Sequence, residues 1–282
     1  MSAISDVRPS PIAGRWYAGD PEQLARQIDH YLFEAILPPL EGKVLGLIAP
    51  HAGHRFSGRT AAHAFKAVEG QPYELVVVAS PFHSYHPAAL LTSAHHRFTT
   101  PLGEIPIDLD AVARLKEYLA QRETTTLVPV AYDEEHSLEI ELPFLQRSLE
   151  GSFKLLPLMI RSLDIQLLRT VGQGLAEIAR GCSCLLVAST DLSHFYNKRT
   201  ANMLDQEMLK RFTTLDPNEV LLAEKHGVGF ACGAGAVAAV LEAARQLGGN
   251  AVEILHYSTS ADETGDESSV VGYGAAAILK RD

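Results

Sequence analysis

Four short, uninterrupted apolar runs alternate along this chain with stretches whose apolar residues recur at helical spacing. A continuous apolar run of this length is typical of a strand buried on both faces of a sheet. The alternation predicts an α/β fold with a mostly parallel central sheet and helices on both faces. Asp108 and Asp164 stand where the N-caps of two of these helices are expected. The predicted strands are residues 43–50, 74–80, 153–160 and 184–189, and the predicted helices are 57–69, 108–121, 137–150, 164–179, 200–212, 216–225 and 232–247.

The last part of the chain carries two further strand-like runs, residues 251–258 and 269–279. They are close enough in sequence to pair antiparallel at an edge of the sheet. The longest irregular stretch is 81–106, and a connection of that length is typical of a functional segment or a hairpin insertion. No internal repeat or flexible linker divides the sequence, so residues 1–282 are predicted to form one domain.

The charge balance restricts the partners of the protein. The chain has 34 acidic and 24 basic residues, a net charge of −10, which argues against nucleic acid or an anionic membrane as its main partner. No apolar stretch approaches the roughly 18 residues that a membrane span requires, and no secretory signal pattern is present. With three cysteines and no export signal, we expect reduced thiols and a cytoplasmic location.

Polar side chains follow three of the four predicted strands directly. His51 and His54 come after the first strand, His83 after the second, and Asp191 and His194 after the fourth. Because parallel strands place their carboxyl ends at one edge of the sheet, these side chains are expected to converge there.

A further polar cluster, residues 133–139, precedes a predicted helix and can turn toward the same edge. Acidic residues in front of a helix are usually partners of the helix dipole, which is the simpler interpretation of Glu134 and Glu135. His136 and Glu139 are the better candidates for a functional role.

The three cysteines fall in two different settings. Cys182 and Cys184 lie just before or inside a predicted strand, where free cysteine is usually buried. Cys232 lies beside Gly233 at the predicted start of a helix, and a helix N-terminus lowers a thiol pKa and favours the thiolate. The alternative is that Cys232 is only a small residue in a tight helix contact.

Two strand-end imidazoles, His51 and His83, with one anionic ligand and open positions are typical of a catalytic metal site. The chain has twelve histidines, and histidine is the commonest metal ligand. A carboxylate as the third ligand would indicate non-haem iron, whereas a thiolate favours zinc, copper or ferrous iron.

Five motifs, in this order, resemble those of the Memo family, whose bacterial and archaeal members are called AmmeMemoRadiSam system protein B. The resemblance covers nearly the whole chain, from Arg15-Trp16-Tyr17 to Ser268-Ser269. The motifs are His51-Ala-Gly-His54 with Ser57-Gly58, Ser80-Pro81-Phe82-His83, Glu134-Glu135-His136-Ser137-Leu138-Glu139 with Leu142-Pro143, Ser189-Thr190-Asp191-Leu192-Ser193-His194, and Cys232-Gly233.

The resemblance implies a fold similar to the class III extradiol dioxygenases, in which two histidines and a glutamate hold ferrous iron. It implies that His51 and His83 are metal ligands, that Cys232 is the third ligand, and that Asp191 and His194 line the same cleft. The cysteine departs from the dioxygenase pattern, so ring cleavage does not follow from the resemblance. The bacterial name also implies association with a radical-SAM protein and an AMMECR-type protein.

These observations favour a metal-binding protein, and a redox enzyme that uses iron or copper, with zinc as a further option, on an unknown small molecule or peptide. His136 or His194 would act as acid or base, and Asp191 would orient a histidine or a metal-held water. A second hypothesis is an interaction module whose cleft binds a peptide or partner. A third is a hydrolase with Cys232 as nucleophile and a histidine as base.

Overall fold

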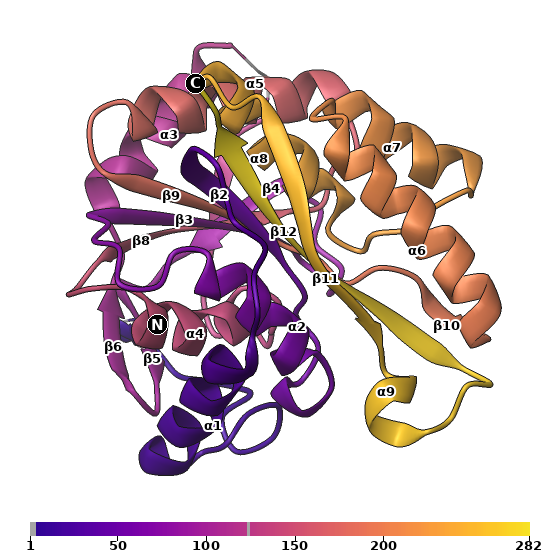
Figure 1. The fold of residues 1–282 in the computed structure, drawn as a ribbon. Coiled ribbons are helices and arrows are strands. Elements are labelled where there is room, and N and C mark those ends of the chain that lie inside the picture. Colours follow the sequence, from indigo (N-terminus) through magenta and orange to yellow (C-terminus); the bar gives the residue numbers. More distant parts are fainter. Residues whose placement is uncertain (1–3, 123–124) are drawn as a thin grey trace.

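A computed structural model describes residues 4–122 and 125–282, and Figure 1 shows its central feature, a large twisted sheet. Within the described residues this sheet has nine strands, in the order β10-β12-β2-β9-β3-β8-β4-β7, and β11 also pairs with β12. The strands are β2 (Lys43–Ala49), β3 (Leu75–Pro81), β4 (Leu90–Ser93), β7 (Leu127–Val130), β8 (Lys154–Ile160), β9 (Cys184–Ser189), β10 (His194–Tyr196), β11 (Ala251–Thr259) and β12 (Val270–Lys280).

The sheet is mixed, which corrects the prediction of a mostly parallel one. Its four central strands β2, β9, β3 and β8 are parallel, as the apolar runs predict. At one end β4 is antiparallel to β8, because the chain returns from β3 through residues 82–89 without the crossover helix that a parallel strand requires. At the other end β12 is antiparallel to both β2 and β11, so the predicted C-terminal antiparallel pair is confirmed.

Helices cover both faces of this sheet (Figure 1). Neighbouring residues of β3 explain why the strand sequence is continuously apolar: Val77 packs into the core on one face and Val78 into the core on the other. One face carries α3 (Leu109–Ala120), α5 (Ile165–Ala179), α6 (Lys198–Thr213), α7 (Pro217–His226) and α8 (Ala234–Gln246). The other carries α1 (Pro21–Glu34), α2 (His54–Lys66), α4 (Leu142–Ser148) and a small sheet of β1 (Val7–Arg8), β5 (Arg97–Thr100) and β6 (Gly103–Pro106).

Local sequence signals account for several helix boundaries. The carboxylates of Asp108 and Asp164 accept backbone N–H groups of the first turns of α3 and α5, as predicted. The helix predicted over 137–150 is a 3-10 turn, η1 (Glu139–Glu141), followed by the short α4, which has a proline in its first turn. A last short helix, α9 (Ala261–Thr264), follows β11.

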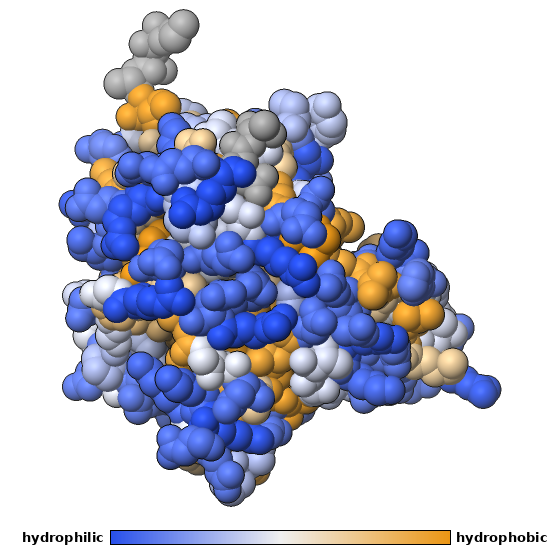
Figure 2. Space-filling view, turned by 90° about the horizontal axis from the view of Figure 1, so that it is seen from above, coloured by the Kyte–Doolittle hydropathy of each residue, from blue (hydrophilic) through white to orange (hydrophobic). Residues whose placement is uncertain are grey.

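One face of the molecule is mostly polar. Figure 2, viewed from above the orientation of Figure 1, shows a mostly hydrophilic face with smaller apolar areas between the polar side chains. None of the helices in the described part of the chain combines the length and hydrophobicity needed to cross a membrane.

Candidate metal centre

His51 follows β2 and is fixed by the neighbouring strand β9. The parallel register pairs Ala49 with Ser189, so the segments that leave these two strands run side by side. The Nδ1 atom of His51 lies 2.9 Å from Oγ of Ser189, and the His51 backbone N–H donates to Oδ1 of Asp191 at 2.7 Å. His51 is only 1% exposed. Burial, and after it the nearby His136 and His83, lower the pKa of His51 well below its usual range, so the ring is neutral.

His83 follows β3 and is held by an acidic residue from a distant loop. Its Nδ1 atom lies 2.9 Å from Oε1 of Glu135, which also accepts the backbone N–H of Ser137 at 2.9 Å. Burial opposes protonation of His83, but the Glu135 carboxylate outweighs burial and raises the pKa of the ring. Burial would likewise raise the pKa of Glu135, yet its hydrogen bonds hold that pKa far below the usual range. Glu135 is therefore an ionised partner of His83.

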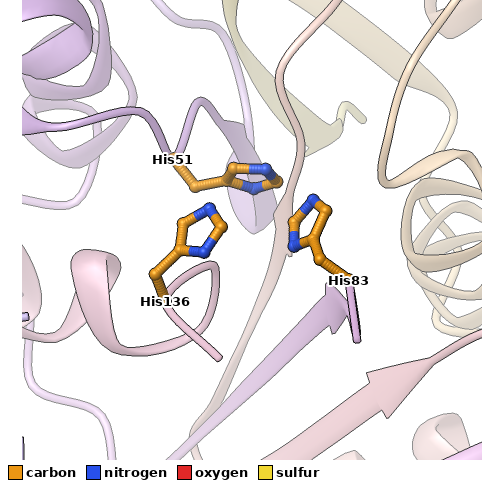
Figure 3. A group of neighbouring side chains, drawn as sticks. All are labelled: His51, His83 and His136. Atoms are coloured by element: carbon orange, nitrogen blue, oxygen red, sulfur yellow. The ribbon is translucent and has the colours of Figure 1, made fainter. Parts of the chain in front are cut away.

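His136, on the same loop as Glu135, completes a group of three imidazoles (Figure 3). One ring nitrogen from each of His51, His83 and His136 lies within 4.8 Å of those of the other two. The His83 and His136 rings are stacked with centroids 4.7 Å apart, and Trp16 covers His136 at 4.1 Å. Burial lowers the pKa of His136 to about 4. The loop thus adds a neutral imidazole to the two strand-end histidines.

Cys232 lies outside this group of three imidazoles but touches one of them. Its Sγ atom is 3.1 Å from Nε2 of His51 and accepts the backbone N–H of Asp191 at 3.2 Å. Gly233 makes this position possible, because a Cβ there would lie 2.3 Å from the carbonyl oxygen of Ser189.

The thiol of Cys232 does not have the lowered pKa that the sequence analysis expects. The residue as a whole is exposed, while its sulfur lies against Nε2 of His51 and the carbonyl oxygen of Asp191. Removal of the sulfur from water, and then the Asp191 carboxylate, raise the pKa of the thiol. Helix α8 begins only at Ala234, two residues later.

Asp191 and His194 lie beside the histidines. Oδ1 of Asp191 accepts the backbone N–H groups of His51 and Ala52, at 2.7 and 3.3 Å, and burial raises the pKa of this carboxyl to about 7. Nδ1 of His194 lies 2.9 Å from the Leu192 carbonyl, to which it donates, and among the described residues Nε2 has no hydrogen-bond partner. Burial lowers the pKa of His194, so it is a neutral base.

The loop that carries His136 is anchored by a buried arginine that the sequence analysis missed. Arg8, 1% exposed, donates to Oδ1 of Asp133 at 2.8 Å, to Oε2 of Glu139 at 2.5 Å and to the Glu135 carbonyl at 2.8 Å. Glu139, a candidate site residue, also accepts the Tyr17 hydroxyl at 2.7 Å. Through these contacts with Arg8 and Tyr17, Glu139 fixes the position of the loop.

Two further predictions need correction. Glu135 is not a dipole partner of a helix but the hydrogen-bond partner of His83. The signals for this in the sequence were its position directly before His136 and its place in the third family motif. Cys182 and Cys184 are partly exposed rather than buried, because β9 begins only at Cys184. The hydrogen bond with Cys184 lowers the pKa of Cys182 to about 7.

Together, the fold and the histidine group define an α/β protein with a candidate metal centre at the carboxyl edge of its central strands. The model of the family described as Memo-like protein matches residues 8–277, and the chain belongs to the Memo family. A MEMO1 family protein of Methanopyrus kandleri is 35% identical over 97% of this chain and 99% of its own length. The corresponding proteins of Nitrosopumilus maritimus and Aquifex aeolicus are 32% and 30% identical, over 97% and 95% of this chain and 100% and 97% of their own.

Among solved structures, an uncharacterized protein from Escherichia coli K12 is 13% identical and covers 83% of this chain and 99% of its own, with a TM-score of 0.45. A likeness at that level supports no conclusion about fold or function. The similarity to class III extradiol dioxygenases therefore stays a prediction.

Proposed function

We propose that this protein binds a redox-active transition metal, iron or copper, and uses it on a small molecule or peptide in a dioxygenase-like fold. The observation that carries the proposal is the convergence of His51, His83 and His136 within 4.8 Å, with the Cys232 sulfur 3.1 Å from Nε2 of His51. In this proposal His51 and His83 are ligands, and His136 and Cys232 are the third and fourth donors.

The state of the donors fits a metal ion. Nδ1 of His51 and Nδ1 of His83 are engaged by Ser189 and Glu135, which leaves Nε2 of each ring for a ligand bond. A histidine ligand whose other nitrogen is held by a carboxylate is the usual arrangement in metal sites. His51 and His136 are neutral, as ligands must be. Imidazole and thiolate donors suit iron, copper and zinc, and a bound iron or copper would supply one-electron chemistry.

The remaining polar groups of the site would handle protons. Asp191, whose pKa is about 7, can hold or release a proton near neutral pH while it fixes the backbone at His51. His194 offers a free Nε2 lone pair and can accept a proton from a substrate. His136 keeps that role only when it is not a ligand.

The contact between Cys232 and His51 is also the geometry of a nucleophile and its base, so a hydrolase is the second candidate. A nucleophilic pair of this type needs a thiolate. Here the thiol pKa is raised and the His51 pKa is lowered, so both groups are neutral in the metal-free site. These directions argue against the hydrolase, whereas a bound metal ion would itself displace the proton of the thiol.

Metal analysis of protein purified without air or chelators tests the proposal. We expect iron or copper near one equivalent in the unaltered protein and a large loss in His51→Ala and His83→Ala. His226→Ala, an exposed histidine on α7, is the matched control and should keep its metal. Circular dichroism should show intact folds, because His51 and His83 lie beyond the ends of β2 and β3 and are not part of the strands. Equal metal content in all four proteins would refute the assignment, and zinc alone would refute the redox chemistry.

A further inference from the structure

Behind His51, the hydroxyl of Ser189 has three polar neighbours at hydrogen-bond distance. Its Oγ atom lies 2.9 Å from Nδ1 of His51, 2.6 Å from the carbonyl oxygen of Ser137 and 2.7 Å from Oε1 of Glu141. A serine hydroxyl has one hydrogen to donate and two lone pairs that accept. All three contacts are satisfied only if one neighbour receives that hydrogen and the other two donate.

The carbonyl of Ser137 decides the assignment, because a carbonyl oxygen can only accept. If Ser189 gave its hydrogen to Glu141 or to His51, two oxygens would face each other at 2.6 Å with no proton between them. The hydrogen of Ser189 therefore goes to Ser137. Glu141 and Nδ1 of His51 must then both donate to Ser189.

We infer that Glu141 is a neutral carboxylic acid that donates its proton to Ser189, and that His51 consequently carries its own proton on Nδ1 and its lone pair on Nε2. Glu141 is thereby a positioning residue: it acts on the site through Ser189 and touches no reacting group. The inference rests on the proposed function only for the role of His51 as a ligand.

The surroundings of Glu141 agree with the neutral form. The residue is the last of η1, is fully buried, and its Oε2 atom has no hydrogen-bond partner among the described residues. An ionised carboxylate with one oxygen unpaired in the interior would be strongly disfavoured. Burial, and also the Asp191 carboxylate, raise the pKa of Glu141 well above its usual range.

Infrared difference spectroscopy of the metal-free protein at pH 7 tests the protonation. We expect a carboxylic acid C=O band in the unaltered protein that is missing in Glu141→Gln, whose amide keeps a donor for Ser189 without a charge. Glu135→Gln is the matched control, and it should lose carboxylate absorption while the acid band remains. Absence of an acid band that depends on Glu141 would overturn the inference.

A second variant keeps the test decisive if Glu141→Gln does not fold. Ser189→Ala retains Glu141 and removes its acceptor, so the acid band should persist at a shifted frequency; an unshifted band would refute the hydrogen bond. Nitrogen-15 NMR of the histidine side chains should show the His51 proton on Nδ1, and a proton on Nε2 would refute the tautomer. Neither readout needs a metal, so a metal-free natural state would refute the proposed function and leave this inference standing.

Discussion

The two strand-end histidines are each held through Nδ1, but one partner is ionised and the other is neutral. Nδ1 of His83 meets an ionised carboxylate, Glu135, directly, whereas Nδ1 of His51 meets a hydroxyl, Ser189, behind which Glu141 is neutral. A carboxylate partner makes an imidazole a stronger donor to a metal than a neutral partner does. Two residues that look equivalent in the sequence thus differ as candidate ligands.

The two sides of the site also differ in what holds them. The strand side, around His51, is fixed by the register of β2 and β9. The loop side, which carries Glu135 and His136, has no ladder of its own and is fixed by side chains, above all by Arg8. The loop side should therefore be the more easily broken.

Arg8→Met should have the largest effect, because it removes the cation of a buried network and leaves Glu139 and Asp133 without it. We expect a loss of about 3–5 kcal/mol in the free energy of unfolding. Arg26→Met, which breaks an exposed pair with Glu22, is the control and should cost no more than about 1 kcal/mol. Urea unfolding measures both. Similar values for the two variants would show that the loop does not depend on Arg8.

Glu135→Gln should come next. The amide keeps the shape of the side chain but removes the charge next to His83, so metal affinity should fall about 10- to 100-fold, as for other partners of metal-binding histidines. Competition with a chelator of known affinity measures the change. Glu134→Gln, an exposed neighbour, removes the same charge from the loop and should have little effect. Equal losses would mean that only net charge matters.

The pH dependence of stability should have opposite signs for the two glutamates in metal-free protein. The folded-state pKa of Glu135 is lowered, so its contribution is present above the usual pKa of 4.5 and is lost as the pH falls. The folded-state pKa of Glu141 is raised, so the unfolded state gains by ionising above pH 4.5, and stability is lost as the pH rises, by up to about 1.4 kcal/mol per pH unit.

Each substitution to glutamine should remove one of these two dependences. Relative to the unaltered protein, Glu141→Gln should gain stability between pH 5 and 7, whereas the deficit of Glu135→Gln should be constant there and shrink below about pH 4.5. Unfolding curves over this pH range measure both. If the stability of the two variants changed with pH in the same way, the different charge states of Glu135 and Glu141 would be refuted.

The smallest expected effect is on the rate at which the Cys232 thiol, on the strand side of the site, reacts with an alkylating agent. Alkylation of Cys232 should be slowest with metal bound and only modestly faster after chelation, because binding occupies the sulfur and the raised pKa of the free thiol keeps its thiolate fraction small. Cys182, partly exposed with a pKa of about 7, should react readily in both states and serves as the reactive control. Mass spectrometry of the alkylated peptides separates the sites. An identical rate at Cys232 with and without chelator would speak against a metal bond there.

Parts of this arrangement were predictable because they depend on local pattern. The apolar runs predicted the four central strands, and their carboxyl ends predicted that His51 and His83 approach each other. The antiparallel direction of β4 was not predictable, since it depends on the path of residues 82–89 rather than on the composition of the strand.

The supporting residues escaped prediction for a different reason. Arg8 and Glu139 are 131 positions apart, and nothing near either residue indicates the other. The same holds for Ser189 and Glu141, whose contact exists only because β9 and η1 meet at the end of the sheet. Glu135 was visible as an acidic residue beside a histidine. An acidic residue in front of a helix usually interacts with the helix dipole, however, and that interpretation was preferred.

The strand order β2-β9-β3 also bears on when a growing polypeptide acquires this centre. On the ribosome, His51, His83 and His136 are made before residues 184–189, yet β9 is the strand that lies between β2 and β3 and sets their spacing. Cys232 is made later still. The nascent chain therefore carries three early histidines but no assembled centre until most of it has been synthesised. Topology thus delays the assembly of the candidate metal centre until the surrounding fold can enclose it.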